Sequence, residues 1–478
     1  MTMRVPCIFI LLVASLQTAA QHYSAVHGSP YAGSLGVGNN PAAIVHNPHA
    51  WDLTILGFQE KHTTNAVTVY NYSLLSSPGQ SEYLFNAGNY ARFAHVNFNL
   101  NMLNGRFAIN RQQAIAFGIN IRGYGNIKTG PYHFVDTVES SREFFSLGNS
   151  TVRLRGDFTG SSWLELFGTY AQTMWDGTFD RLNAGVTLKI SRALAGAHVA
   201  LSNAHAARIG HGAGQYYEYT SGSGVYGYSA NFDQWQDNKN SSQNIKDFIS
   251  AGSYGFSVDF GAEYLIKSGA ITAWDEDDYY DYKWKIGVAL LDLGFNRFQY
   301  GRHSRTVSGV RPNMADTLFD EKWEGVEDFA SFNDSLATIV NNMQPLQGRF
   351  TVINPTRLVI NADRHLSGDF YVNADLTINL SSLTGHPYRV TEANLLTIIP
   401  RWETRTLGFF LPVLVNIEGK WWIGGAFKAG PLLLGVHNWG NVFSKNKMQN
   451  GGGYLALVIR PGRQAARDRH LKQYECPE

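Results

Sequence analysis

The chain has 478 residues, of which 48 are glycine, 13% are aromatic and only 16% are charged. Globular chains ordinarily carry about 25% charged residues and about 7% glycine, so this composition favours one large β-sheet over several soluble domains. Lysine and arginine number 39 against 38 acidic residues, which argues against a nucleic-acid partner. The sequence lacks the repeated apolar runs of about 20 residues that a polytopic helical membrane protein needs.

Residues 1–20 have the features of a secretory signal peptide. Arg4 gives a basic start, residues 7–16 are almost entirely apolar, and Thr18-Ala19-Ala20 places small residues before the expected cleavage site. The apolar stretch is too short for a membrane-spanning helix, although a buried N-terminal strand or helix is the alternative. After cleavage Cys476 is the one cysteine left, so we expect no intramolecular disulfide.

Apolar and polar residues alternate along much of the remaining chain. The apolar residues of 96–102 alternate with asparagines, and the same period of two recurs in 115–122, 182–190, 254–261 and 372–380. Successive side chains of a strand point to opposite faces, so each run has one apolar and one polar face. Such runs fit either a solvated antiparallel sheet or a transmembrane barrel with lipid outside.

The length of these runs favours the barrel. Many have about 10 residues, as a tilted strand needs to cross the hydrocarbon layer, and aromatic residues gather near their ends. We therefore predict an all-β fold, a transmembrane antiparallel β-barrel of about 14 strands within 51–460; a secreted β-sandwich or propeller is the alternative. The candidate strands lie near 51–59, 64–72, 94–102, 113–122, 163–174, 182–191, 196–202, 254–267, 281–293, 357–363, 369–380, 395–403, 405–415, 421–428, 431–438 and 453–460.

Three long segments interrupt this pattern, at 123–162, 203–253 and 294–356, and we expect them to be extended loops or inserts. Within the third, 322–343 has the spacing of a helix, which would lie over one mouth of the barrel or be an ordinary surface helix. Residues 461–478 form a basic C-terminal tail without a strand pattern, expected outside the membrane.

The stretch Gly38-Asn39-Asn40-Pro41-Ala42-Ala43 resembles a signature of FadL-like outer-membrane barrels, which include the fatty-acid channel FadL and the secretion component PorV. Other stretches resemble an uncharacterised family of such barrels in Gram-negative bacteria. These are Ala91-Arg92-Phe93, Trp163-Leu164-Glu165, 182–189, 259–264, 290–294, Asn354-Pro355-Thr356-Arg357, Pro400-Arg401-Trp402-Glu403, 424–435 and Cys476-Pro477.

The resemblance implies that residues 21–50 fold into the lumen as an N-terminal plug. Glycine-rich backbone can hydrogen-bond a polar wall while occupying little volume. The resemblance implies that Asn40, Pro41 and Ala42 form the signature of the plug. It also implies that Gly33, Gly36 and Gly38 are the plug's glycines. The alternative interpretation of Asn40-Pro41-Ala42 is an ordinary turn before a short helix.

Motifs of nucleophilic, phosphate-binding and metal-dependent enzymes are missing from the sequence, so we expect no enzyme, no catalytic residues and no cofactor or metal. His46-Asn47-Pro48-His49 offers two imidazoles, but a solvated turn is the better interpretation. Asp275–Asp278 with Asp281 fits a solvated hairpin tip better than a calcium loop. Residues 210–214 fit a flexible loop better than a phosphate loop.

These observations predict an exported protein of the outer membrane. The resemblance to FadL-type channels implies that it binds or passes a small apolar ligand through a plugged lumen. The alternative, on the resemblance to PorV, is a non-transporting partner of an envelope or secretion protein. The expected partners are outer-membrane lipid and such a ligand or protein, and not a nucleic acid.

Overall fold

The computed structural model describes residues 23–73, 78–236, 238–268, 280–417, 419–445 and 447–461. Most of their regular structure is β-strand. Among these residues no helix has the length and apolar character needed to cross a membrane. The predicted signal peptide, the acidic cluster Asp275–Asp278 and nearly all of the basic tail lie outside the described residues.

The strands of the wall are mostly longer than the five or six residues usual in soluble sheets, and the longest has 30 residues. They are β1 (Trp51–Thr64), β4 (Gly88–Asn110), β5 (Gln113–Phe134), β6 (Leu154–Asp176), β7 (Asp180–Ile209), β9 (Tyr254–Ile266), β10 (Trp284–Gln299), β14 (Arg357–Ser367), β15 (Phe370–Asn379), β16 (Leu395–Glu403), β17 (Leu407–Phe410), β18 (Val413–Asn416), β19 (Trp421–Ile423), β20 (Gly425–Ala429), β21 (Leu432–Val436) and β22 (Asn450–Ile459).

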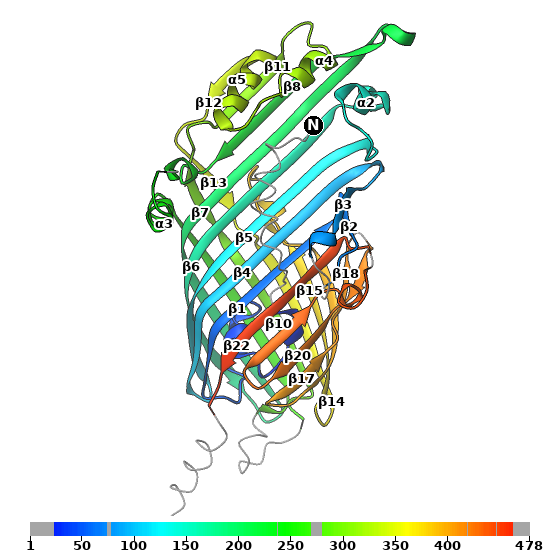
Figure 1. Cartoon of the computed structure of the whole chain (residues 1–478). Coiled ribbons are helices and arrows are strands. Elements are labelled where there is room, and N and C mark those ends of the chain that lie inside the picture. The colour runs from blue at the N-terminus through cyan, green and yellow to red at the C-terminus, as the bar shows by residue number, and fades with distance from the viewer. Residues whose placement is uncertain are drawn as a thin grey trace, which may run out of the picture.

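These strands form a closed antiparallel barrel with 14 positions in its wall, which confirms the predicted fold class (Figure 1). Closure comes from β1, which pairs with β4 on one side and with β22 on the other. Two of the 14 positions are each filled by two consecutive short strands. One is filled by β17 and β18, and the neighbouring one by β19 and β20. Pro412, which has no N–H to donate, lies between β17 and β18. Gly424 lies between β19 and β20, and its N–H donates to the carbonyl of Pro412 at 2.7 Å.

Side chains alternate between the two faces of the wall. On β7 the side chain of Lys189 is buried inside, whereas its neighbours Leu188 and Ile190 are 55% and 59% exposed on the outside. An outer surface of exposed aliphatic and aromatic side chains around a polar interior suits a wall surrounded by lipid. The packed centre of the molecule is therefore the inside of the barrel.

One side of the barrel continues well beyond the rest of the wall, and we call this part the extension (Figure 1). The first half of β7 pairs with β9 and its second half with β8 (Tyr216–Tyr228). From β8 the extension proceeds to β11 (Arg305–Val310) and β12 (Val340–Pro345), while β13 (Arg349–Ile353) pairs with the end of β10. The helices are α2 (Ser141–Ser146), α3 (Ser241–Ser250), α4 (Asp316–Glu321) and α5 (Phe329–Ile339).

The segments 123–162, 203–253 and 294–356, expected to be extended loops or inserts, each contain strand residues. The strand β8 consists mostly of tyrosine, glycine and serine, so it shows no aliphatic run by which to recognise it. The helix expected within 322–343 is present as α5. It packs on β8, where the ring of Phe329 stacks on that of Tyr228 with centroids 4.7 Å apart.

The two ends of the barrel differ in their connections. At one end five hairpins turn within two or three residues, at 111–112, 177–179, 368–369, 404–406 and 430–431, while the connection 267–283 at the same end is longer. At the other end lie the extension, the connection 380–394 and the small hairpin of β2 (Val67–Tyr70) and β3 (Glu82–Phe85). In bacterial outer-membrane barrels the short turns are periplasmic and the long connections extracellular.

An arginine on the outer band tests whether lipid surrounds the wall. We expect Leu188→Arg to lower the free energy of unfolding in vesicles by about 2–4 kcal/mol, because a charge would enter the hydrocarbon layer. The matched control is Leu366→Arg, beside the short turn 368–369, where the exposed leucine lies close to Arg364 and the change should be below about 1 kcal/mol. Equal effects at the two sites, measured by urea unfolding, would contradict a lipid-facing band.

Candidate functional site

Residues 23–50 lie inside the barrel, and we call them the inner segment. They form three short 3-10 helices, η1 (Ser24–Val26), η2 (Gly33–Leu35) and η3 (Pro41–Ile44). The helix η2 contacts β1 and β4, whereas η3 contacts β5, β6, β7 and β9. The inner segment contains no lysine, arginine, aspartate or glutamate.

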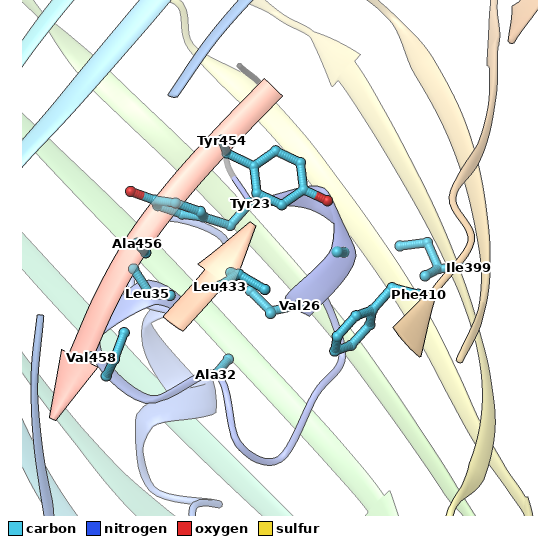
Figure 2. Packing of buried hydrophobic residues seen from close by; sticks show 11 residues of the cluster. Tyr23, Val26, Ala32, Leu35, Ile399, Phe410, Leu433, Tyr454, Ala456 and Val458 are labelled. Carbon is cyan, nitrogen blue, oxygen red and sulfur yellow. The ribbon is translucent and has the colours of Figure 1, made fainter. Parts of the chain in front are cut away.

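Apolar side chains of the inner segment cover two apolar areas of the inner wall. In the first, Figure 2 shows side chains of the segment packed against β16, β17, β21 and β22. The residues involved are Tyr23, Ala25, Val26, Ala32 and Leu35 of the segment and Ile399, Phe410, Leu433, Tyr454, Ala456 and Val458 of the wall. In the second, the wall strands are β5 and β6. Here Val37, Ile44 and Val45 pack on Ala114, Ala116, Phe167 and Ala171.

Four arginines hold the inner segment by its backbone carbonyls. Arg106 of β4 donates to the carbonyl of Ile44 at 2.6 Å and to that of His49 at 2.5 Å. The other three bonds run from Arg357 to Gly38 at 3.2 Å, from Arg401 to Gly28 at 3.4 Å and from Arg460 to Tyr31 at 2.9 Å. The segment is thus seated without a carboxylate of its own.

The sequence signature lies at the start of η3, against β9. The side-chain oxygen of Asn40 accepts a hydrogen bond from the N–H of Ala42 at 2.9 Å, and Pro41 is the first residue of the helix. The amide nitrogen of Asn40 also donates to the carbonyl of Ala262 at 3.0 Å. These residues therefore form a helix cap and also contact the wall, while their role in a plug stays a prediction.

The three glycines predicted for the plug each make a different local contact. Gly33 has a φ of +58°, which favours glycine, and a side chain there would collide with the carboxylate of Asp52. A Cβ on Gly36 would approach that of Ala32 to 3.1 Å. Gly38 supplies the carbonyl that Arg357 binds. That these glycines serve a plug also stays a prediction.

A buried group of charges crosses the lumen beside the inner segment. The carboxylate of Asp292, on β10, accepts hydrogen bonds from Arg122 of β5 at 2.5 and 2.7 Å and from Lys189 of β7 at 2.7 Å. Arg357 of β14 also binds Asp292. The other two acids are Asp259, 2.6 Å from Lys189, and Glu165, 3.3 Å from Arg122. Three cations thus face three carboxylates, all buried.

A second buried group lies nearer the short turns. The guanidinium of Arg401 binds the carboxylate of Asp363 through two hydrogen bonds of 2.5 and 2.9 Å and that of Glu403 at 3.2 Å. Glu403 also accepts a 2.6 Å hydrogen bond from Lys428. As in the first group, the charges of the wall neutralise one another, so the wall needs no charged partner on the inner segment.

The connection 380–394 folds inward from the other end of the barrel, and we call it the inner strap. Its Glu392 accepts hydrogen bonds from Asn97 of β4 at 2.8 and 3.0 Å and lies 3.5 Å from the ammonium of Lys61 on β1. Its Tyr388 stacks on His198 of β7 with ring centroids 3.7 Å apart. The strap joins β15 to β16, so these contacts fasten it to distant parts of the wall.

The histidine pair differs from the solvated turn expected for it. His46 is buried, with its ring between those of Tyr280 and Tyr282 at 5.7 and 5.6 Å. Burial follows from the position of His46 in the inner segment, which local sequence could not indicate. Within the described part of the chain, no group of three or more histidine, cysteine or acidic residues is arranged to hold a metal. Residues 210–214 form the turn between β7 and β8.

The sequence analysis did not predict the two buried charged groups, although several of their residues lie in the stretches that resemble the barrel family. Lys189, Asp259 and Asp292 each stand near the middle of a strand. The sequence feature that could have indicated these groups is a charged residue on the polar face of a strand, away from its ends. Its partner could not be inferred, because that depends on which strands face one another across the lumen.

A closed barrel with an apolar exterior, an ion-paired interior and a chain segment folded inside has the architecture of an outer-membrane barrel protein. The chain belongs to the family described as DUF5723, a family of unknown function, whose model matches residues 41–436. This agrees with the uncharacterised barrel family expected from the sequence. No curated protein matches the chain.

FadL-type barrels are among the similar solved structures. The TodX deltaS2S3 mutant, a monoaromatic hydrocarbon channel, is 9% identical with a TM-score of 0.37, over 90% of this chain and 94% of that chain. A FadL homologue of Pseudomonas aeruginosa is 11% identical with a TM-score of 0.38, over 89% and 93%. The toluene transporter TbuX of Ralstonia pickettii is 7% identical with a TM-score of 0.31, over 90% and 94%. Similarities this distant assign no ligand to this chain.

A valine at Gly185 tests how the inner segment fits its wall. A Cβ on Gly185 would lie 2.6 Å from the carbonyl carbon of Pro41, so we expect Gly185→Val to displace η3. In a Cys476→Ser background, maleimide labelling of Ala42→Cys should become at least about tenfold faster. The control Gly168→Val, on β6 where nothing lies within 4 Å of the added Cβ, should leave labelling unchanged. Unchanged labelling in both variants would show that the segment is not seated there.

Neutralising Asp292 tests the first charged group. Asp292→Asn would leave three buried cations short of a carboxylate, and we expect a loss of about 3–5 kcal/mol in the free energy of unfolding. Asparagine tolerates the φ of +58° at this position, so the loss would report charge rather than backbone strain. The exposed Asp136→Asn, measured by the same urea titration, should change stability by less than about 0.5 kcal/mol. If Asp292→Asn also lowered the free energy of unfolding by less than about 0.5 kcal/mol, the first charged group would not stabilise the wall.

Proposed function

We propose that this protein is an outer-membrane barrel that binds or passes a small apolar molecule, and that the inner segment is its releasable plug. The apolar outer band and the barrel architecture support the location, and the predicted signal peptide agrees with it. The proposal contains no catalytic step. The inner segment would leave its seat, and the apolar molecule would use the wall areas that the segment had covered.

The observation that carries the proposal is the absence of charged residues from the inner segment, described from Tyr23 to Ala50. Release of a charged segment would leave buried ions unpaired, which costs several kcal/mol for each ion. In the two buried charged groups of the wall the carboxylates and cations bind one another, whereas Asp375 binds His27 of the segment at 2.9 Å and Asp52 accepts the N–H of Ser34 at 2.6 Å. Release therefore breaks apolar contacts and hydrogen bonds of uncharged groups, among them the backbone carbonyls, the N–H and hydroxyl of Ser34, and also the contact of His27 with Asp375.

The two wall areas under the inner segment support an apolar ligand. One is lined by Ile399, Phe410, Leu433 and Tyr454, and the other by Ala114, Ala116, Phe167 and Ala171. Further apolar clusters, such as that of Leu395, Leu414 and Trp422, lie elsewhere on the wall, so the segment covers part of the apolar interior. Exposing these areas to water is unfavourable by about 25 cal/mol per Å², and an apolar ligand in place of the segment would remove this cost.

A disulfide between the inner segment and the wall tests the proposal. The side-chain oxygens of Ser34 and Thr54 lie 2.8 Å apart, close enough for Ser34→Cys and Thr54→Cys to form a bridge in a Cys476→Ser background. Oxidation should abolish binding of the apolar fluorophore N-phenyl-1-naphthylamine, and reduction should restore it. The readout is fluorescence titration of the purified, reconstituted barrel.

The matched control joins two wall strands instead. The hydroxyls of Thr169 on β6 and Thr187 on β7 are also 2.8 Å apart, and both side chains are buried. A bridge between Thr169→Cys and Thr187→Cys should leave fluorophore binding unchanged. If the Ser34–Thr54 bridge also leaves binding unchanged, or if the reduced barrel binds no fluorophore, the plug proposal is wrong and a non-transporting role beside an envelope protein is favoured.

A further inference from the structure

The outer face of the wall carries a cationic hollow where the apolar band ends. On β7, Arg192 follows the exposed Ile190 on the outward face, and its partner across the ladder to β9 is Tyr254. Tyr254 is 68% exposed, and Phe256, opposite Ile190, is 45% exposed. The guanidinium of Arg192 lies over the Tyr254 ring, 4.8 Å from its centroid.

The helix α3 forms the other side of this hollow, on the outside of the wall beside β7 (Figure 1). Arg192 donates to the carbonyl of Ile249 at 3.0 Å and to that of Ser250, so it holds the end of the helix against the wall. The hollow is lined by Arg192, Lys246, Ile249, Ser250 and Tyr254. Its lining thus combines two cations with an aliphatic and an aromatic side chain.

The cations of the hollow have no ion pair with any described acidic residue. The neighbouring carboxylate, that of Asp247, is bound at 2.8 Å by Lys239. A further cation, Arg297, lies on β10, two residues beyond Phe295, which pairs with Phe256. The register therefore places Arg297 on the outward face at about the height of Tyr254, and its guanidinium lies over the Phe295 ring.

We propose that this hollow binds the phosphorylated headgroup of a membrane lipid. The phosphate would lie between Arg192 and Lys246, with Arg297 nearby, and the acyl chains would run along Tyr254, Phe256 and Ile190. Charge complementarity supports an anionic headgroup, because phosphate oxygens accept hydrogen bonds from guanidinium and ammonium groups. Continuity with the apolar band supports a lipid over a soluble anion. This inference depends on the proposed location of the barrel in a membrane.

The test compares lipid binding by the whole reconstituted barrel and by the double variant Lys246→Gln/Arg297→Gln, which leaves Arg192 to hold α3. Native mass spectrometry would count phosphatidylglycerol bound in mixed phosphatidylglycerol and phosphatidylcholine. We expect the wild type to retain phosphatidylglycerol and the variant to bind it about 30-fold more weakly. The control Arg153→Gln/Lys283→Gln removes two exposed cations elsewhere and should bind as the wild type does.

The possible outcomes separate this inference from the proposed function. Insertion is checked first, by resistance of the barrel to unfolding until it is heated in detergent. A barrel that does not insert contradicts the membrane location itself. A barrel that inserts but binds phosphatidylglycerol no better than phosphatidylcholine, or equally well in the double variant, overturns the lipid site alone. Displacement of the lipid by millimolar inorganic phosphate would show a site for the free anion instead.

Discussion

The interior of this barrel depends on one shared carboxylate. Asp292 stands where the pairing of β10 with β9 shifts register, and it binds cations of β5, β7 and β14. Removing charges from water is costly unless each finds a partner, and in this interior the partners come from opposite parts of the wall. Because the wall is neutralised by its own residues, whatever else enters the lumen can be uncharged. The composition of the inner segment follows from this constraint.

The alternation of side chains made the fold predictable from the sequence. A period of two over about 10 residues indicates a strand, its two faces and a membrane barrel together. The extension was not predictable in the same way. In β8, tyrosine, glycine and serine occupy both faces, and the strand is held by pairing with the second half of β7 rather than by an apolar face.

The candidate site was only partly predictable. Asn40, Pro41 and Ala42 could be singled out by their resemblance to a family signature, and the alternative interpretation, a turn before a short helix, agrees with the cap of η3. The surroundings of His46 and the partners of Asp292 could not, because both depend on distances across the lumen. The inward position of the strap could not be predicted for the same reason. Its Glu392 binds Asn97 and approaches Lys61, which lie about 300 residues earlier in the chain. Local sequence carries no record of contacts of that kind.

The interior is occupied from both ends, but the two occupants are held differently. The inner segment is held by apolar contacts and hydrogen bonds, including those of His27 with Asp375 and of Ser34 with Asp52, whereas the strap brings a buried carboxylate to Lys61. Separating a buried ion pair costs more than exchanging carbonyl hydrogen bonds for water. The strap thus has an ammonium–carboxylate pair with the wall that the inner segment does not have.

The closing pair of strands sets an order for building the molecule. The inner segment is joined directly to β1, and β1 completes the cylinder by pairing with β22, the last strand of the chain. The wall can thus be sealed only after its final strand has been made. A segment that packs on the inner faces of β16, β17, β21 and β22 can complete its packing only once these late strands are in place, although it comes first in the chain.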